Sequence, residues 1–208
     1  MKTRAQNLTA ILINLFIVVS ELVMIIKRMQ SADVLAFSYY TILSNLMAMA
    51  AGIIFLIHAF SGSERLKYAR TMLRYYATCM LAFTFIIVIS VLTPMCFYAR
   101  LDPSFLYLEN AALFLHVINP ALSFVSFVFL EDNSTLKKDH PAFMLLISFC
   151  YTVVLIILNI LRIVDGPYPF FQVYNNPVWA TILWIVGLAG FDYLINYLIY
   201  RVGTRRKK

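Results

Sequence analysis

The chain has 208 residues, of which 62% are hydrophobic and 15% aromatic, and its mean hydropathy is +0.81. Soluble domains carry about 25% charged residues, whereas here the charged fraction is only 13%. Such a composition excludes a soluble enzyme, a disordered chain and a coiled coil. Three scattered cysteines, Cys79, Cys96 and Cys150, form no CxxC pair, which argues against a disulfide scaffold and against a cysteine zinc site.

Six segments are long and apolar enough to cross a membrane, which takes about 20 mostly apolar residues. Turn-forming and charged residues separate these segments, as expected of loops in water. The connections are short, so we expect a single domain over residues 1–208, an all-α bundle of six transmembrane helices. The predicted helices cover residues 8–26, 34–60, 75–98, 105–130, 142–161 and 178–200.

The basic residues divide unequally between the two sides of this predicted bundle. Thirteen of the 17 lie on the side that holds both termini, and the other side has only Lys27, Arg28, Arg100 and Arg162. Basic residues concentrate in cytoplasmic loops, so we expect both termini in the cytoplasm. The net charge of +7 is then a signal of topology, and no nucleic-acid partner is needed to explain it.

Polar side chains inside the predicted helices gather in the half of the bilayer away from the termini. Because a charged group at the centre of a spanning helix costs roughly 2.5–3.5 kcal/mol, each needs a partner or a function. Two polar residues, Asp192 and Asn196, lie deeper, toward the cytoplasm. The residues of the outer half are Glu21, Thr41, Ser44, Asn45, Glu109, Asn110, His116, Asn119, Asn159 and Arg162.

Spacing places several of these polar residues on shared helix faces. Thr41, Ser44 and Asn45 stand at i, i+3 and i+4, and therefore face the same way. The face of Ser44 continues through Ala48 and Gly52, small residues that allow another helix to approach closely.

A second stripe runs along the predicted helix 105–130, through Glu109, His116, Asn119, Pro120 and Ser123. Proline has no N–H to donate to the carbonyl four residues earlier, which here belongs to His116. We therefore expect this helix to bend at its histidine.

Structural interpretations of these residues remain open at this point. An intramembrane threonine often bonds back to its own helix, the asparagines can join helices, and Glu21 can form an ion pair with Arg162. The functional interpretation rests on a hydroxyl, an imidazole and amides at similar depth. His58 and His140 lie at the cytoplasmic side, so no second histidine is available for a two-histidine metal site. The remaining chemistry is that of a Ser or Thr nucleophile with a His base.

Three short motifs carry a resemblance to a known family. They are Tyr39-Tyr40-Thr41-Ile42-Leu43-Ser44-Asn45, then Leu115-His116-Val117-Ile118-Asn119-Pro120, then Tyr168-Pro169-Phe170. In order and spacing they resemble the androgen-induced protein and androgen-dependent TFPI-regulating protein family, especially its bacterial six-helix members. The animal proteins hydrolyse fatty acid esters of hydroxy fatty acids with an intramembrane threonine and a histidine.

The resemblance implies a lipid-ester hydrolase without metal or cofactor, in the plasma membrane, with its site toward the outer leaflet and its substrate taken from the bilayer. The implied nucleophile is Thr41 and the implied base is His116. Candidates for stabilising the oxyanion or orienting the imidazole are Asn45, Ser44, Asn119 and Glu109. Candidates for the substrate pocket are Glu21, Arg162, Tyr168, Pro169 and Phe170. The alternatives are a small transporter or channel, whose solute path the same residues line, and a purely structural membrane protein.

Overall fold

The computed structural model describes residues 4–30, 37–108 and 111–205. These residues are helical, with turns and loops between the helices and no strand among them. The π- and 3-10-helical segments carry the label η. In chain order the elements are α1 (Arg4–Gln30), α2 (Tyr40–Ser61), α3 (Glu64–Ile87), η2 (Val88–Leu92), α4 (Thr93–Tyr98), η3 (Pro103–Leu106), η4 (Phe114–Ile118), α5 (Asn119–Val125), η5 (Ser126–Leu130), α6 (His140–Ile160), η6 (Pro169–Phe171) and α7 (Val178–Thr204).

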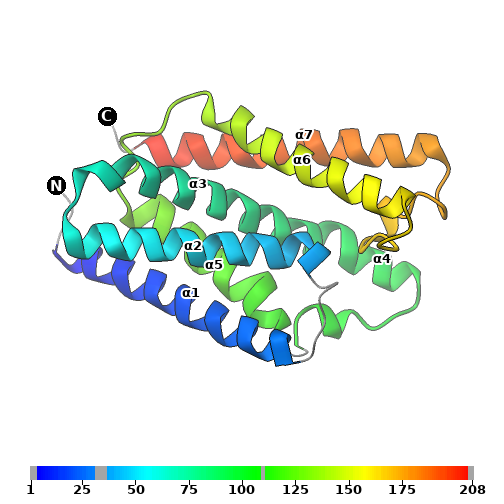
Figure 1. Ribbon diagram of the computed structural model, residues 1–208, viewed down its shortest axis with the longest axis horizontal. Helices are drawn as coiled ribbons and strands as arrows, with labels where there is room; N and C mark the ends of the chain where they lie inside the picture. Colours follow the sequence, from blue (N-terminus) through cyan, green and yellow to red (C-terminus); the bar gives the residue numbers. More distant parts are fainter. Residues whose placement is uncertain (1–3, 31–36, 109–110, 206–208) are drawn as a thin grey trace.

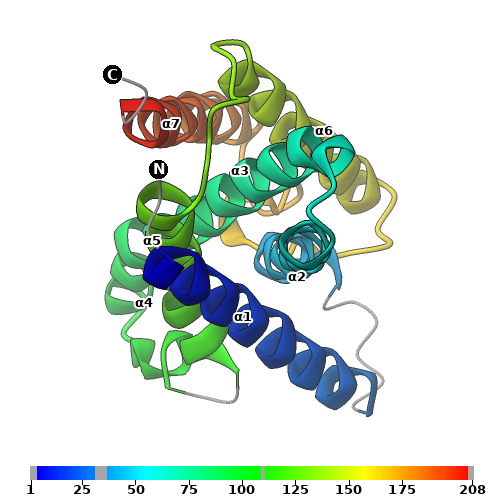
Figure 2. The ribbon, with the colours of Figure 1, turned by 90° about the vertical axis from the view of Figure 1, so that its left-hand side faces the viewer.

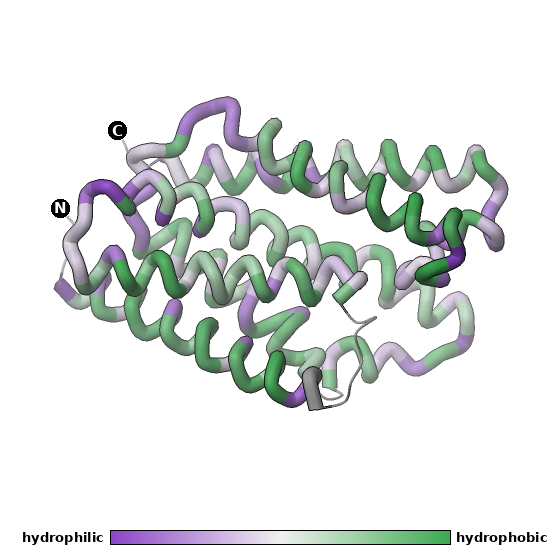
Figure 3. Tube along the Cα trace, viewed as in Figure 1, coloured by the Kyte–Doolittle hydropathy of each residue, from purple (hydrophilic) through white to green (hydrophobic). Residues whose placement is uncertain are grey.

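Five of the described helices are long and apolar enough to cross a membrane: Arg4–Lys27, Tyr40–Ser61, Glu64–Tyr98, His140–Ile160 and Val178–Thr204. A shorter apolar helix covers Phe114–Leu130. Hydrophilic residues lie mainly toward the two ends of the bundle, and the middle is mostly hydrophobic (Figure 3). The chain is therefore a helical membrane protein, as its composition predicts.

Three predicted helix boundaries are wrong. The second helix begins at Tyr40 rather than at residue 34. The third helix begins at Glu64 rather than at residue 75 and continues to Tyr98, because its first turns bury arginines whose partners are far away in the sequence. The fourth begins at Phe114, after the 3-10 helix Pro103–Leu106. The side chain of Asp102 caps that short helix by accepting the Ser104 N–H at 2.9 Å.

The helices run side by side along one direction, with α3 in the middle (Figures 1 and 2). This helix packs against α2, α5 and α7. The beginning of α1 and the end of α7 lie at the same end of the bundle (Figure 1). The other end carries α4 and the loop between α6 and α7, and it also holds the start of α2.

The stripe of small residues on α2 allows close helix contact, as predicted. A Cβ atom on Gly52 would lie 2.8 Å from Val18 Cγ2 and 3.4 Å from the Asn14 carbonyl oxygen, both on α1. Ala48, one turn earlier, is fully buried. The glycine is thus required where α1 and α2 meet.

At His116, where we expect a bend, the helix contains a π-helical segment, η4. Here the Asn119 N–H donates to the Phe114 carbonyl, five residues earlier. Pro120 follows directly and has no N–H of its own. A π segment at this position adds a residue to one turn, a feature that often marks functional sites.

Candidate functional site

A cavity lies between α2, α3, α6, α7 and the loop that carries η6. Its walls are mostly apolar and aromatic, with several hydroxyl groups and a single carboxylate among the lining residues. Such a lining suits a ligand with a hydrocarbon chain and a few polar groups. The lining residues are Tyr40, Thr41, Phe83, Thr84, Ile87, Val88, Leu92, Leu145, Ser148, Phe149, Tyr151, Thr152, Tyr168, Phe170, Phe171, Ile185, Leu188, Ala189 and Asp192.

Thr41 meets Tyr168 at this cavity. The Tyr168 hydroxyl accepts the Tyr40 N–H at 3.0 Å, next to Thr41. The first N–H groups of a helix have no partner within the helix, and Tyr39, which precedes α2, supplies no side-chain cap. Tyr168 therefore caps α2 at the residue before Thr41.

The Tyr168 hydroxyl keeps its proton at neutral pH. Burial raises its pKa to about 12, although hydrogen bonds with Thr41 and Tyr40 act in the opposite direction. Within the Tyr-Pro-Phe run, Tyr168 and Phe170 line the cavity, whereas Pro169 does not.

Asn45 joins α2 to η4 instead of pointing a free donor at the cavity. Its Nδ2 donates to the Thr41 carbonyl at 2.8 Å and to the Leu115 carbonyl at 3.2 Å. Both amide protons are used in these bonds, so the expected role as oxyanion donor is not available to Asn45 as it stands. Its Oδ1 accepts from Asn119 Nδ2 at 3.3 Å.

Ser44, the other oxyanion candidate, is also occupied. Its Oγ donates to the Thr41 carbonyl at 2.8 Å and lies 3.1 Å from Thr84 Oγ1 on α3. The hydroxyl thus bonds back to its own helix and links α2 to α3, the structural role common for hydroxyls within membranes.

His116 is oriented by a backbone carbonyl, not by the candidate side chains. Its Nδ1 lies 2.6 Å from the Leu106 carbonyl oxygen. Since a carbonyl only accepts, Nδ1 carries the proton and Nε2 of the neutral ring has the basic lone pair. No hydrogen bond among the described residues joins His116 to Thr41, and His116 does not line the cavity.

Asn119 is hydrogen-bonded to Glu21 and Ser20 and not to the imidazole of His116. Its Nδ2 donates to Glu21 Oε1 at 2.5 Å, and its Oδ1 accepts from Ser20 Oγ at 3.2 Å. The last orienting candidate, Glu109, lies outside the described residues.

The ion pair between Glu21 and Arg162, one of the structural alternatives, is not among the ion pairs of the described residues. Glu21 is buried beside Asn119, whereas Arg162 is exposed and places its guanidinium 4.7 Å from the centre of the Tyr174 ring. Neither residue lines the cavity. The opposite charges and similar depth of the two residues suggested the pair, but one side chain is buried between helices and the other is exposed.

The structure adds two polar pairs at the cavity that the sequence interpretation missed. The Tyr40 hydroxyl lies 3.1 Å from Ser148 Oγ, and Ser148 lines the cavity together with Asp192. Asn196 Nδ2 donates to Asp192 Oδ2 at 3.1 Å, while Asp192 Oδ1 has no hydrogen-bond partner among the described residues. Asp192 and Asn196 stood out as deep polar residues, but Ser148 looked like an isolated hydroxyl in an apolar helix.

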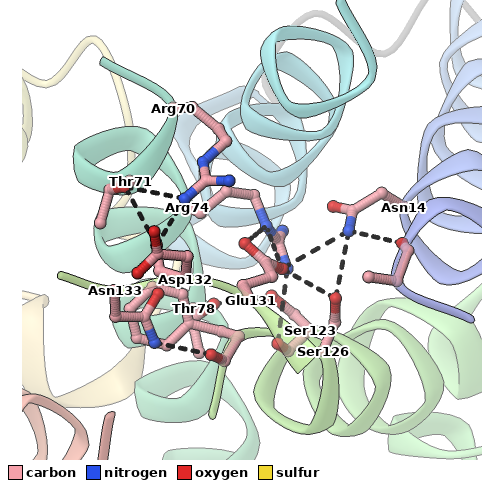
Figure 4. Close-up of polar contacts among 12 residues, drawn as sticks. Asn14, Arg70, Thr71, Arg74, Thr78, Ser123, Ser126, Glu131, Asp132 and Asn133 are labelled. Atoms are coloured by element: carbon pink, nitrogen blue, oxygen red, sulfur yellow. Dashed lines mark hydrogen bonds and ion pairs between the residues drawn. The ribbon is translucent and has the colours of Figure 1, made fainter. Parts of the chain in front are cut away.

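A second polar cluster lies near the end of the bundle where α1 begins, and its ion pair was also missed (Figure 4). Arg74 and Glu131 are almost completely buried, with Nη2 and Oε1 2.8 Å apart. Ser126 Oγ donates to Glu131 Oε1 at 2.7 Å, and Asn14 Nδ2 donates to Ser126 Oγ at 3.1 Å. Because Arg74 fits the topological excess of basic residues, nothing in the sequence marked it as buried.

Among the described residues, no group of three or more His, Cys, Asp or Glu side chains is placed to hold a metal ion. No protein-family model, curated protein or solved structure matches this chain.

Proposed function

We propose that this protein is an intramembrane lipid-ester hydrolase, related to the androgen-induced protein family, with Thr41 as nucleophile and His116 as base. One observation carries the proposal: the three motifs of the resemblance, far apart in the sequence, contact one another around the start of α2. Tyr168 bonds the Tyr40 N–H, and Asn45 bonds the Leu115 carbonyl beside His116.

In the proposed reaction, Thr41 Oγ attacks the ester carbonyl while His116 Nε2 accepts the hydroxyl proton. His116 then returns the proton to the leaving alcohol, and an acyl-threonine remains. A water molecule, deprotonated by His116, hydrolyses this intermediate to the fatty acid and regenerates Thr41. The proton transfer needs Oγ and Nε2 within about 2.6–3.2 Å, a distance that often closes only with substrate bound.

The Leu106 carbonyl supports the proposed role of His116. By holding the proton on Nδ1, it leaves Nε2 as the proton acceptor. In catalytic triads a third group orients the base in the same way. Tyr168, whose hydroxyl accepts the Tyr40 N–H next to Thr41, fixes the start of α2 and so positions the nucleophile.

The apolar lining of the cavity supports a lipid as substrate. A lipid ester already has its acyl chains in the bilayer, so it reaches Thr41 without leaving the hydrocarbon. Aromatic residues near the α6–α7 loop, such as Phe170 and Phe171, suit the interface between headgroups and hydrocarbon.

The proposed topology has six membrane crossings, with the Phe114–Leu130 helix as the fourth. An even number of crossings agrees with α1 beginning and α7 ending at the same end of the bundle (Figure 1). The excess of basic residues at that end favours the cytoplasm. Thr41 then opens to the outer leaflet of a cell membrane.

A transporter or channel is the second candidate, and the buried carboxylate of Asp192 at the cavity favours it. Solute paths in transporters run past polar groups near the bilayer midplane, and Asp192 lies in the middle of α7. The two functions differ in what they require of Thr41, since only a hydrolase needs a nucleophile.

Labelling with a lipid-like fluorophosphonate tests the hydrolase. The wild-type protein is expected to gain one adduct, which peptide mass spectrometry assigns to Thr41. Thr41→Ala should gain none, Thr41→Ser should keep it, and His116→Gln should react at least about tenfold more slowly, within the range for loss of a general base.

Equal labelling of wild type and Thr41→Ala, with both folded by size exclusion and circular dichroism, would overturn the assignment. Uptake of a polar solute by vesicles that contain Thr41→Ala protein would favour the transporter instead.

A further inference from the structure

Asp192 lines the cavity in the middle of α7, is only 1% exposed, and has no positively charged partner among the described residues. Asn196 Nδ2 donates to Oδ2, but Oδ1 has no hydrogen-bond partner in the part of the chain that the structure describes. None of the three ion pairs between described side chains includes it.

An unpaired carboxylate in this setting is costly. A charge within the membrane normally pairs with another group or marks a functional site. A buried oxygen without a hydrogen bond costs about 1–3 kcal/mol, and more when it is charged. A ligand that brings both a positive charge and an N–H would remove both costs.

Aromatic rings line the same cavity. The Tyr40 ring lies 5.6 Å from the Phe83 ring and 5.1 Å from the Tyr151 ring, in edge-to-face arrangements. All three residues line the cavity with Asp192. Aromatic faces attract ammonium groups through cation–π interactions, so ring faces and a carboxylate together suit a protonated amine.

We infer that the cavity binds a lipophilic primary amine, with its ammonium group on Asp192 Oδ1 and its hydrocarbon chain between the aromatic walls. The charge-assisted N–H···O bond fills the acceptor that the protein leaves open. This site does not depend on Thr41 acting as a nucleophile, so the inference and the proposed function stand or fall separately.

Fluorescence quenching in phosphatidylcholine nanodiscs tests the inference. The chain has two tryptophans, and Trp184 lies 5.3 Å from the ring of Phe170 in the cavity wall. In a Trp179→Phe background, 12-bromododecylamine should quench Trp184 saturably. Asp192→Asn should weaken this binding at least about tenfold, the effect of losing one charged hydrogen bond of roughly 1.5–3 kcal/mol.

Two controls make the result specific. The alcohol 12-bromododecanol has the same chain without the charge, and its quenching should be weak and unchanged by Asp192→Asn. Asp165→Asn, in the loop between α6 and α7, should leave amine binding unaltered. Equal affinity of the amine for wild type and Asp192→Asn would overturn the inference, and so would an equal loss for amine and alcohol.

Photocrosslinking of the wild-type protein covers the case in which Asp192→Asn fails to fold. A dodecylamine with a diazirine next to the amine should label peptides that contain residues 145–152 and 185–192. Labelling confined to other peptides would contradict an ammonium group at Asp192.

Discussion

Two buried carboxylates in this bundle have opposite surroundings. Glu131, near the end where α1 begins, has Arg74 at 2.8 Å and a hydrogen bond from Ser126 (Figure 4). Asp192, which lines the cavity, has one neutral hydrogen-bond donor, Asn196, and one oxygen without a partner among the described residues. The comparison separates a carboxylate whose charge is balanced within the protein from one whose balance is left to a ligand.

Breaking the Arg74–Glu131 pair should have the largest effect on stability. Arg74→Ala leaves an uncompensated buried carboxylate, a change that costs about 3–5 kcal/mol. Denaturant unfolding in detergent, followed by circular dichroism, measures this loss. The double variant Arg74→Met/Glu131→Leu removes both charges and should recover most of the stability, because apolar residues often replace buried ion pairs at little cost. A double variant as unstable as Arg74→Ala would contradict this account.

Low pH should reduce the stabilisation that the Arg74–Glu131 ion pair provides. Burial alone would raise the pKa of Glu131, but the Arg74 charge and the hydrogen bonds from Arg74 and Ser126 outweigh it and hold the pKa below its ordinary value. The stabilisation is complete above the unfolded-state pKa of about 4.3 and is lost as the pH falls through the lower folded-state pKa. The free energy of unfolding of wild type should therefore fall more steeply below pH 4 than that of Arg74→Met/Glu131→Leu. Parallel curves would disprove the linkage.

At the cavity, Tyr168→Phe should affect the reaction more than the fold. It removes the hydroxyl that accepts the Tyr40 N–H next to Thr41, and a net hydrogen bond is worth roughly 0.5–1.5 kcal/mol. We expect the fluorophosphonate reaction rate at saturation to fall up to about tenfold, with the half-saturating probe concentration unchanged. Tyr174→Phe, whose exposed hydroxyl bonds the Ile160 carbonyl at 2.7 Å, is the matched control and should react as wild type does.

The smallest effect should come from Lys67→Ala. Lys67 Nζ lies 3.6 Å from Glu64 Oε2 and 3.8 Å from Asp132 Oδ2, and these side chains are partly exposed. Exposed ion pairs contribute only about 0–1 kcal/mol. The same unfolding assay should show a change within that range, and a loss close to that of Arg74→Ala would remove the distinction between buried and exposed charges.

Much of the fold follows from hydropathy, because a segment that crosses the membrane must satisfy its backbone hydrogen bonds within itself, as an apolar helix does. The start of the third helix was missed since Arg70 and Arg74 look like loop residues, and only Asp132 and Glu131, some 60 residues later, allow their burial. The early start predicted for the fourth helix reflects apolar composition, which does not distinguish a 3-10 turn from a spanning helix.

The site was predictable in its residue types but not in their pairing. Depth and motif pointed to Thr41, His116 and Tyr168, yet the partners of each depend on which helices meet. The bond from Tyr168 to the start of α2 spans 128 residues of sequence. The bond to His116 comes from the backbone carbonyl of Leu106, which every residue type has, so no pattern of residues in the sequence predicts it.

The π-helical turn at Phe114–Ile118 has a consequence for tolerance to deletion. In an α-helix each residue turns the chain by about 100°, so removal of one residue within this turn would restore the α pattern and rotate His116 relative to Asn119 by roughly that angle. The two side chains now serve different partners, Leu106 and Glu21. The extra residue therefore sets the direction in which each of them points, and a one-residue deletion would change that direction without shortening the span appreciably.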